Sequence, residues 1–96
     1  MNVLTVAHVE ISEGSREAFI QHFDDYRTRV LSEEPGTLTF DLCVNCHGKN
    51  QFLIEERFLD EASRQAHLST DYHDAAVNKL RAYIVNGDAT NYQALG

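Results

Sequence analysis

The stretch that decides the fold is TLTFDLCVNCHGKNQFLIEERFL, residues 37–59. Two runs of alternating apolar and polar side chains, residues 38–44 and 52–59, flank a polar segment at residues 45–50. Alternation of this kind is typical of β-strands, and a polar turn between two such runs predicts a β-hairpin. The first run carries a bulky apolar side chain at every second position: Leu38, Phe40, Leu42 and Val44. We expect this face to be covered by other protein.

A strand and a helix precede the hairpin. Residues 3–11 carry apolar side chains at both odd and even positions, which predicts a strand with neither face simply solvated. Ser15 is a candidate N-cap for a helix that ends near Glu33, because Pro35 disfavours helical geometry before it and Gly36 favours a turn. The apolar stripe of this helix consists of Phe19, Phe23, Tyr26 and Val30.

Two helical segments follow the hairpin. Asp60 is a candidate cap for a short helix that continues to about His67. Ser69 or Thr70 is expected to cap the next helix. The residues at helical spacing in that second segment are His73, Ala76, Val77, Leu80 and Ile84.

The chain ends in a candidate strand at residues 89–95, after Gly87 and Asp88 interrupt the helical pattern. The resulting order, β-α-β-β-α-β, is typical of the ferredoxin-like split βαβ arrangement, an α+β fold in which helices cover one face of an antiparallel sheet. Residues 1–96 therefore form one domain, and its core is thin for its size. We expect the face carrying Phe40 and Leu42 to pack against the same face of a second copy, giving a homodimeric α+β barrel.

Composition excludes several classes of partner. Fifteen acidic and eight basic side chains give a net charge of −7, and no basic cluster is present that would bind phosphates. We therefore expect no nucleic-acid partner and no membrane partner. The first residues lack a basic segment followed by an apolar run, so a cytoplasmic location is expected.

Four segments together resemble the antibiotic biosynthesis monooxygenase family across nearly the whole chain. They are GSREAF (14–19), EPGTLTFDL (34–42), FLIEERF followed by DEA (52–58 and 60–62), and AHLSTDYH (66–73). The resemblance implies a dimeric α+β barrel and one of three activities: cofactor-free oxygenation of phenols and quinols, haem degradation, or isomerisation of a phosphorylated autoinducer-2 breakdown product.

Departures from the family pattern affect the assignment of roles. Residues 66–80 look especially like the isomerase branch, but where relatives place proline, histidine and an aromatic residue this chain has Asp71, Tyr72 and His73. Phe58 stands where relatives often carry tryptophan. Haem degradation fits less well, because the positions that resemble its asparagine, tryptophan and iron-binding histidine hold Ala7, His67 and Val77.

Glu56 shares a predicted strand face with Ile54 and Phe58. A carboxylate among bulky apolar groups is costly unless it is paired. Burial in a pocket would raise its pKa and suit it to general acid or base catalysis. A structural ion pair with an arginine would look the same in sequence, and both interpretations stay open.

His67, His73 and Tyr72 are the other candidates for chemistry. Either imidazole is suited to proton transfer near neutral pH, and Tyr72 is suited to hydrogen-bonding a substrate oxygen. His73 also lies on an apolar helix stripe, where a core histidine is the plainer interpretation. Among the aromatic residues, Phe58 and Phe23 are expected to contact a ligand.

The string CVNCH at residues 43–47 matches the C-x-x-C-H pattern of covalent haem attachment. Attachment normally requires export, and the string spans the end of a strand and a turn. A zinc site would need a further ligand pair, which is absent near the hairpin. We expect no metal and no cofactor, and we leave a disulfide between Cys43 and Cys46 as an open alternative.

The hypothesis from sequence is a cofactor-independent monooxygenase of a small quinol or phenol. Glu56, His67 and His73 compete for the proton-transfer role, and Tyr72 positions the substrate. One alternative is an isomerase of a small phosphorylated dione, with Lys79, Arg81 and Lys49 as candidate anion-binding groups. The other alternative is a non-catalytic dimeric barrel that binds a small ligand.

Overall fold

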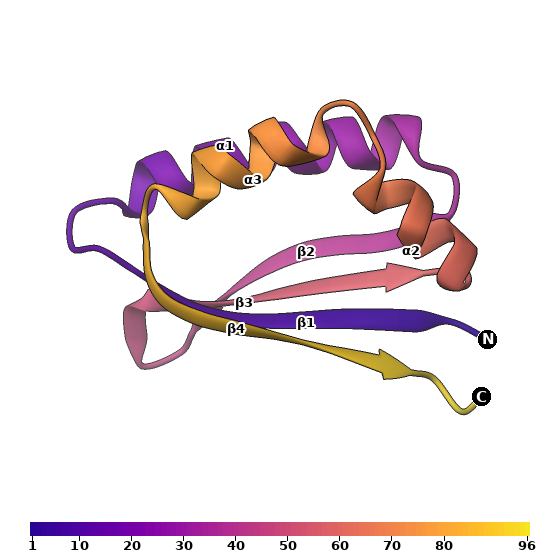
Figure 1. Cartoon of the computed structure of the whole chain (residues 1–96). Helices are drawn as coiled ribbons and strands as arrows, with labels where there is room; N and C mark the ends of the chain where they lie inside the picture. The colour runs from indigo at the N-terminus through magenta and orange to yellow at the C-terminus, as the bar shows by residue number, and fades with distance from the viewer.

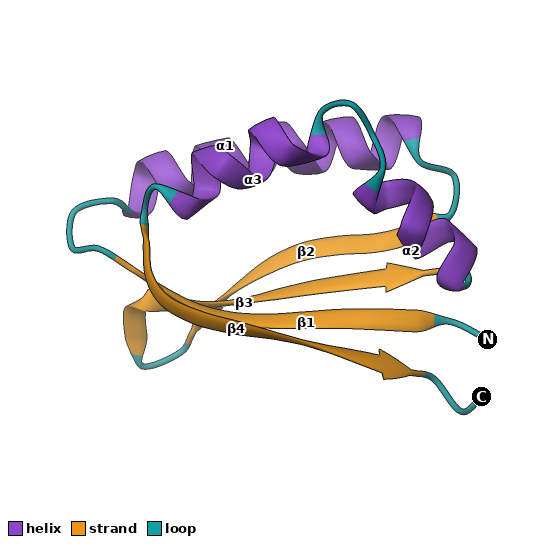
Figure 2. Cartoon of the chain, viewed as in Figure 1, coloured by secondary structure: helices purple, strands orange, loops and turns teal.

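Four strands and three helices follow one another in the order β-α-β-β-α-α-β (Figures 1 and 2). The computed structural model describes residues 1–96. The elements are β1 (Val3–Ile11), α1 (Arg16–Glu33), β2 (Thr37–Asn45), β3 (Gly48–Phe58), α2 (Glu61–Leu68), α3 (His73–Arg81) and β4 (Ile84–Gln93). The ferredoxin-like α+β fold predicted from the sequence is confirmed, including the hairpin and both helical segments after it.

The strands form a single antiparallel sheet in the order β2-β3-β1-β4. Helices α1 and α3 lie next to each other over one face, with α2 at one end of the same layer (Figure 1). The opposite face carries no helix (Figure 2). No helix is long and apolar enough to cross a membrane.

The core lies between α1 and the β2–β3 half of the sheet. All four residues of the predicted α1 stripe are buried, which confirms that stripe as the packing face. The core cluster consists of Ile11, Phe19, Phe23, Tyr26, Val30, Phe40, Phe52, Ile54 and Leu80. Because the helices make most of their contacts with β2 and β3, the β1–β4 half of this face is less covered.

One prediction about strand orientation is wrong. Phe40 is 1% exposed and stacks on Phe23 with ring centroids 5.2 Å apart, so it faces the helices and not a partner. Leu42 also packs against the core cluster, whereas Leu38 is 45% exposed. A register shift between Thr37 and Thr39 leaves Leu38 outside the alternation, so Leu38 does not share the face of Phe40 and Leu42.

The last strand and the start of α3 also differ from the prediction. β4 begins at Ile84, which was assigned to the helix, and it runs through Gly87. A Cβ at Gly87 would lie 2.9 Å from the carbonyl oxygen of His8, so glycine here allows close pairing with β1 and does not end the strand.

The predicted caps of α3 act on α2 instead. The hydroxyls of Ser69 and Thr70 bond back to the carbonyls of Gln65 and His67 and so close the end of α2. The N-cap position of α3 is Tyr72, which makes no side-chain capping bond. The cap of α2 is as predicted.

Candidate active site

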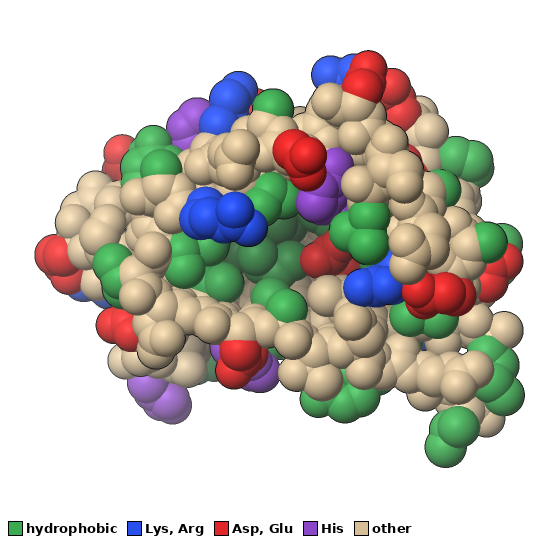
Figure 3. All heavy atoms as spheres, in the orientation of Figure 1, with side chains coloured by type: hydrophobic (Ala, Val, Ile, Leu, Met, Phe, Trp, Pro, Cys, Tyr) green, Lys and Arg blue, Asp and Glu red, His purple; other side chains and the backbone are tan.

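A cavity of about 360 Å³ lies between α2, α3 and the sheet. Most of its lining is apolar, and Figure 3 shows hydrophobic side chains on the floor of this hollow with charged side chains around it. Its apolar walls include Phe23, Phe40, Ile54, Phe58, Val77 and Leu80. A mostly apolar pocket with a few polar groups is the usual form of a small-molecule site.

A second hollow of about 420 Å³ lies across β3, β1 and β4. Its lining is mainly polar and includes His8, Glu10 and Asp88, all of them exposed. It contains no buried titratable side chain. The cavity beneath the helices is therefore the better candidate for chemistry.

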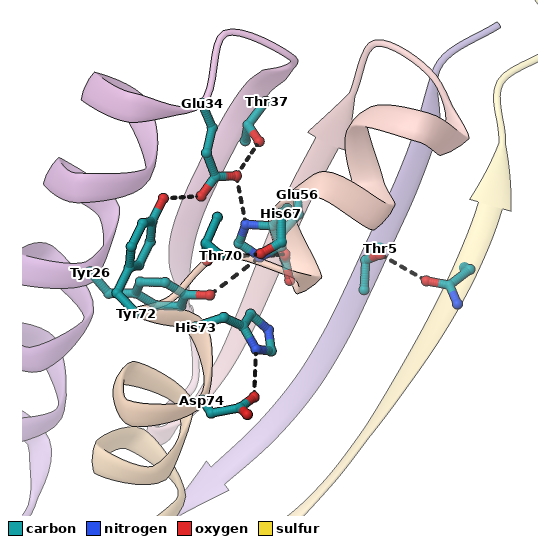
Figure 4. A network of polar contacts seen from close by, with 11 residues as sticks. Thr5, Tyr26, Glu34, Thr37, Glu56, His67, Thr70, Tyr72, His73 and Asp74 are labelled. Carbon is teal, nitrogen blue, oxygen red and sulfur yellow. Dashed lines mark hydrogen bonds and ion pairs between the residues drawn. The ribbon is translucent and has the colours of Figure 1, made fainter.

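His67 is the centre of the polar network in the inner cavity (Figure 4). Its side chain, on α2, is only 2% exposed. Its Nδ1 lies 2.7 Å from Glu34 Oε1. On the other side of the ring, its Nε2 lies 3.4 Å from Glu56 Oε1 and 3.2 Å from the Tyr26 hydroxyl. The imidazole is thus held between two carboxylates.

The position of the proton on His67 follows from these partners. An ionised carboxylate only accepts hydrogen bonds, so Nδ1 must carry a proton and donate it to Glu34. In the neutral ring Nε2 is then free to accept, and the Tyr26 hydroxyl is the donor within reach. When the ring gains a second proton, Nε2 donates toward Glu56.

Electrostatics favour proton binding at this site. Burial alone would lower the pKa of His67, but the contact with Glu56 and the negative charges of Glu34 and Glu56 outweigh it and raise the pKa above its ordinary value. Burial, together with the charges of Glu56 and Glu34, raises the pKa of Tyr26 far above its ordinary value. Tyr26 therefore remains a hydrogen-bond donor at neutral pH.

Glu34 is the member of the His67 network that sequence reasoning missed. It lies directly after α1, and besides the bond to His67 it accepts hydrogen bonds from the Thr37 hydroxyl at 2.8 Å and from the Tyr72 hydroxyl. Its side chain is 9% exposed. A signal was present, because a carboxylate at a helix C-terminus is disfavoured by the helix dipole and needs compensating partners.

Glu56 and His73 both line the cavity, as the sequence hypothesis required. Glu56 comes from β3 and is 16% exposed, so a ligand can reach it. The ring of His73 lies perpendicular to that of His67 with centroids 5.2 Å apart, and its Nδ1 is 3.2 Å from the exposed carboxylate of Asp74. The two histidines therefore share one cavity, but only His67 is enclosed between carboxylates.

The remaining candidates divide between the cavity and its surroundings. Phe58 and Phe23 both line the cavity, and the Phe58 ring lies 5.3 Å from the His67 ring. Tyr72 lines a groove between α1 and α3, with its hydroxyl on Glu34 and the Arg29 guanidinium 4.4 Å from its ring centroid. Burial and then the bond to Glu34 raise the pKa of Tyr72. Tyr72 thus contacts Glu34 from the α1–α3 groove and not from the cavity.

The cysteines of the hairpin lie away from the cavity. Cys43 and Cys46 are exposed free thiols. They form no metal-binding cluster with His47, since no three His, Cys, Asp or Glu side chains in the structure are arranged to hold a metal ion.

The fold and site together define a class of protein: a ferredoxin-like α+β domain with an acid–imidazole–acid network under an apolar cavity. The sequence profile of the family described as antibiotic biosynthesis monooxygenase matches residues 2–79. The chain belongs to the antibiotic biosynthesis monooxygenase family. A comparison with curated proteins gives no significant match.

Solved structures with the same fold come from several bacteria. A Caulobacter crescentus protein provisionally named an antibiotic biosynthesis monooxygenase is 20% identical with a TM-score of 0.92, over 99% of this chain and 91% of that one. A Nitrosomonas europaea protein with the same provisional name is 17% identical with a TM-score of 0.89, over 98% and 90% of the two chains. At these identities the likeness concerns the fold alone.

Proposed function

We propose that this protein is a cofactor-independent monooxygenase of a small quinol or phenol. The observation that carries the proposal is the buried His67, held between Glu34 and Glu56 at the edge of a mostly apolar cavity. An imidazole whose pKa is raised by two carboxylates is a base suited to work near neutral pH.

The first step is removal of a proton from the substrate's hydroxyl group. Glu56 is the member of the pair that a ligand can reach, so the hydroxyl binds against Glu56 and the proton passes to the Glu56–His67 pair. Glu34 is a positioning residue, because it holds Nδ1–H and leaves Nε2 toward Glu56. Glu34 thus orients His67, and the Glu56–His67 pair acts as the base that faces the substrate. A base oriented by a further group is the usual arrangement in general base catalysis.

The second step is reaction of the electron-rich phenolate with molecular oxygen. One oxygen atom bonds to a ring carbon as a hydroperoxide. Loss of the ring hydrogen and cleavage of the O–O bond then release the second oxygen atom as water. A phenol and O₂ thus give a quinone and water, with all four electrons supplied by the substrate, and no external reductant is needed. The protein supplies the base and a site that excludes water.

Other residues have supporting roles in this proposal. Phe58 and Phe23 form walls against which a flat ring packs. His73 is a second proton carrier at the cavity wall. Tyr72, expected from the sequence to hold the substrate, acts through Glu34 instead, because its hydroxyl bonds to that carboxylate and it does not line the cavity.

The two alternatives have less support. Of the basic residues considered for a phosphorylated dione, Lys49 pairs with Glu13 and Lys79 lies in the α1–α3 groove, so only Arg81 lines the cavity. Arg64 also lines it but is paired with Glu61, so no cluster of free cations is present for a phosphate. A purely binding role predicts exposed and unperturbed acid–base groups, whereas His67 is buried with a raised pKa.

We also infer that the protein acts as a homodimer. The uncovered sheet face carries Leu4, Val6 and Leu53, which are half-buried, and Tyr92, which is exposed. These side chains alternate with those that face the cavity, so a second copy packed on this face would leave the cavity intact. Light scattering at micromolar concentration should give twice the chain mass; a stable monomer would contradict the inference.

A cytoplasmic location is part of the same proposal. Two exposed free thiols, Cys43 and Cys46, suit a reducing compartment. Fractionation of cells that produce the protein at native level is the direct test.

An oxygen-uptake assay over a panel of quinols and phenols, with and without a metal chelator, tests the function. Wild-type protein should consume oxygen with at least one substrate, unaffected by chelator. Glu56→Gln and His67→Gln should each reduce kcat by about 100-fold or more, which is the usual range for a general base. Glu17→Gln is the matched control, since Glu17 is exposed in the first turn of α1 and lies neither in the cavity nor on the uncovered sheet face. No uptake with any substrate would overturn the proposal.

A further inference from the structure

The charges around the inner cavity are distributed unevenly. Glu34 and Glu56 lie at the His67 end. Two arginines also line the cavity, Arg64 from α2 and Arg81 from α3. Figure 3 shows basic side chains on two sides of the apolar hollow. Arg64 precedes His67 by three residues on α2 and so lies at that same end, whereas Arg81 lies at the far end of α3 from His73. Only Arg81 is therefore separated from the two carboxylates along the cavity.

Both guanidinium groups have binding capacity left. Arg81 is exposed and forms no ion pair with any carboxylate. Arg64 is 19% exposed and forms one ion pair, in which its Nη1 lies 3.0 Å from Glu61 Oε1. A guanidinium has five N–H donors in a fixed planar arrangement, so each arginine can still bind a carboxylate.

Two of only eight basic residues line this cavity, in a chain with net charge −7. Two acidic side chains near this rim are highly exposed: Asp88 is 73% exposed and lies 3.4 Å from His8, and Asp74 is 97% exposed and lies 3.2 Å from His73, so solvent screens both. An anion at Arg81 would gain from its charge, whereas an anion at the His67 end would be repelled by Glu34 and Glu56.

We propose that the cavity binds an aromatic acid, a flat phenol or quinol that carries a carboxylate at the end opposite its reacting hydroxyl. The carboxylate lies against Arg81, the ring packs on the apolar walls, and the hydroxyl points to Glu56 and His67. This inference names the substrate class of the proposed monooxygenase, and its account of the hydroxyl rests on that proposed function.

Paired ligands that differ only in charge test the inference directly. The probes are 6-hydroxy-2-naphthoate and 6-hydroxy-2-naphthamide, whose fluorescence is easily followed because the protein has no tryptophan. Wild-type protein should bind the acid at least about tenfold more tightly than the amide, as expected for charge-assisted hydrogen bonds to a carboxylate. Raising the salt concentration should weaken binding of the acid and leave the amide unchanged.

Variants assign the effect to the arginines. Arg81→Gln should weaken binding of the acid by about tenfold, whereas Arg64→Gln should weaken it less, because Arg64 lies at the His67 end and is paired with Glu61; neither should affect the amide. Lys79→Gln is the control, because it removes the same charge from the same helix but lies in the other groove. Far-UV circular dichroism checks that each variant is folded.

Three results would overturn the inference: equal binding of acid and amide, equal loss in Arg81→Gln and Lys79→Gln, or no binding of either ligand at millimolar concentration. Binding is measured without oxygen, so these outcomes are separate from turnover. If the acid binds through Arg81 but no quinol or phenol, with or without a carboxylate, supports oxygen uptake, the monooxygenase proposal fails while the anion site stands.

Discussion

Replacing Glu34 by glutamine tests the network around His67 most informatively. The carboxylate accepts hydrogen bonds from His67 Nδ1, the Thr37 hydroxyl and the Tyr72 hydroxyl. A hydrogen bond to a charged group contributes about 1.5–3 kcal/mol and a neutral one about 0.5–1.5 kcal/mol. Glutamine keeps one acceptor oxygen, so two bonds weaken and the third must rearrange. We expect a loss of about 2–3 kcal/mol in the free energy of unfolding near pH 6.

The loss should depend on pH in a defined direction. Because the pKa of His67 is raised in the folded protein, its contribution is fully present below the unfolded pKa of about 6.5 and disappears as the pH rises through the folded pKa. One proton changes stability by at most about 1.4 kcal/mol per pH unit. Wild-type stability should therefore fall above about pH 6.5, and it should fall less in Glu34→Gln.

Urea unfolding followed by circular dichroism at pH 6 and pH 9, at one fixed protein concentration, measures both effects. Glu33→Gln is the control, because the adjacent Glu33 forms an exposed pair with Arg29 and should matter little at either pH. An equal loss in Glu34→Gln and Glu33→Gln, or a loss in Glu34→Gln that does not change with pH, would refute the reasoning.

Three further substitutions test the sheet. Gly87→Ala should destabilise the protein by about 1–3 kcal/mol in thermal or urea unfolding, because the added Cβ would lie 2.9 Å from the backbone oxygen of His8; a neutral result would mean that β1 and β4 are not paired this closely. Phe40→Ala should cost about 3–5 kcal/mol and Leu38→Ala less than about 1 kcal/mol, since only Phe40 faces the helices; similar costs for the two would instead support the shared face predicted from sequence.

The parts of the fold that were predictable from sequence are those set by local periodicity. The stripe from Phe19 to Val30 and the cap at Asp60 depend on residues within a few positions of each other, and both are as predicted. The face of β2 that meets the helices was not predictable, because alternation shows that Phe40 and Leu42 share a face but not which face the helices cover. The register shift near Thr37, which separates Leu38 from them, has no signature in the residues themselves. Gly87 suggested an interruption, but its purpose is close contact with the neighbouring strand.

Only part of the His67 network was predictable from sequence. Glu56 and His67 were found because a carboxylate on an apolar strand face and a histidine in a family segment stand out in sequence. Glu34 was missed because its partners His67 and Tyr72 lie 33 and 38 residues further along the chain. Only the fold brings these three side chains together, so no local pattern links them.

Histidine NMR of the wild-type protein tests the central claim, that two carboxylates hold His67 as a proton carrier at the cavity. Long-range ¹H–¹⁵N correlation spectra recorded across a pH titration, with the signal assigned by its loss in His67→Gln, report both the tautomer and the pKa. We expect the neutral ring of His67 to be protonated at Nδ1 and its pKa to lie above the ordinary value of about 6.5. A ring protonated at Nε2, or a pKa below the ordinary value, would contradict it.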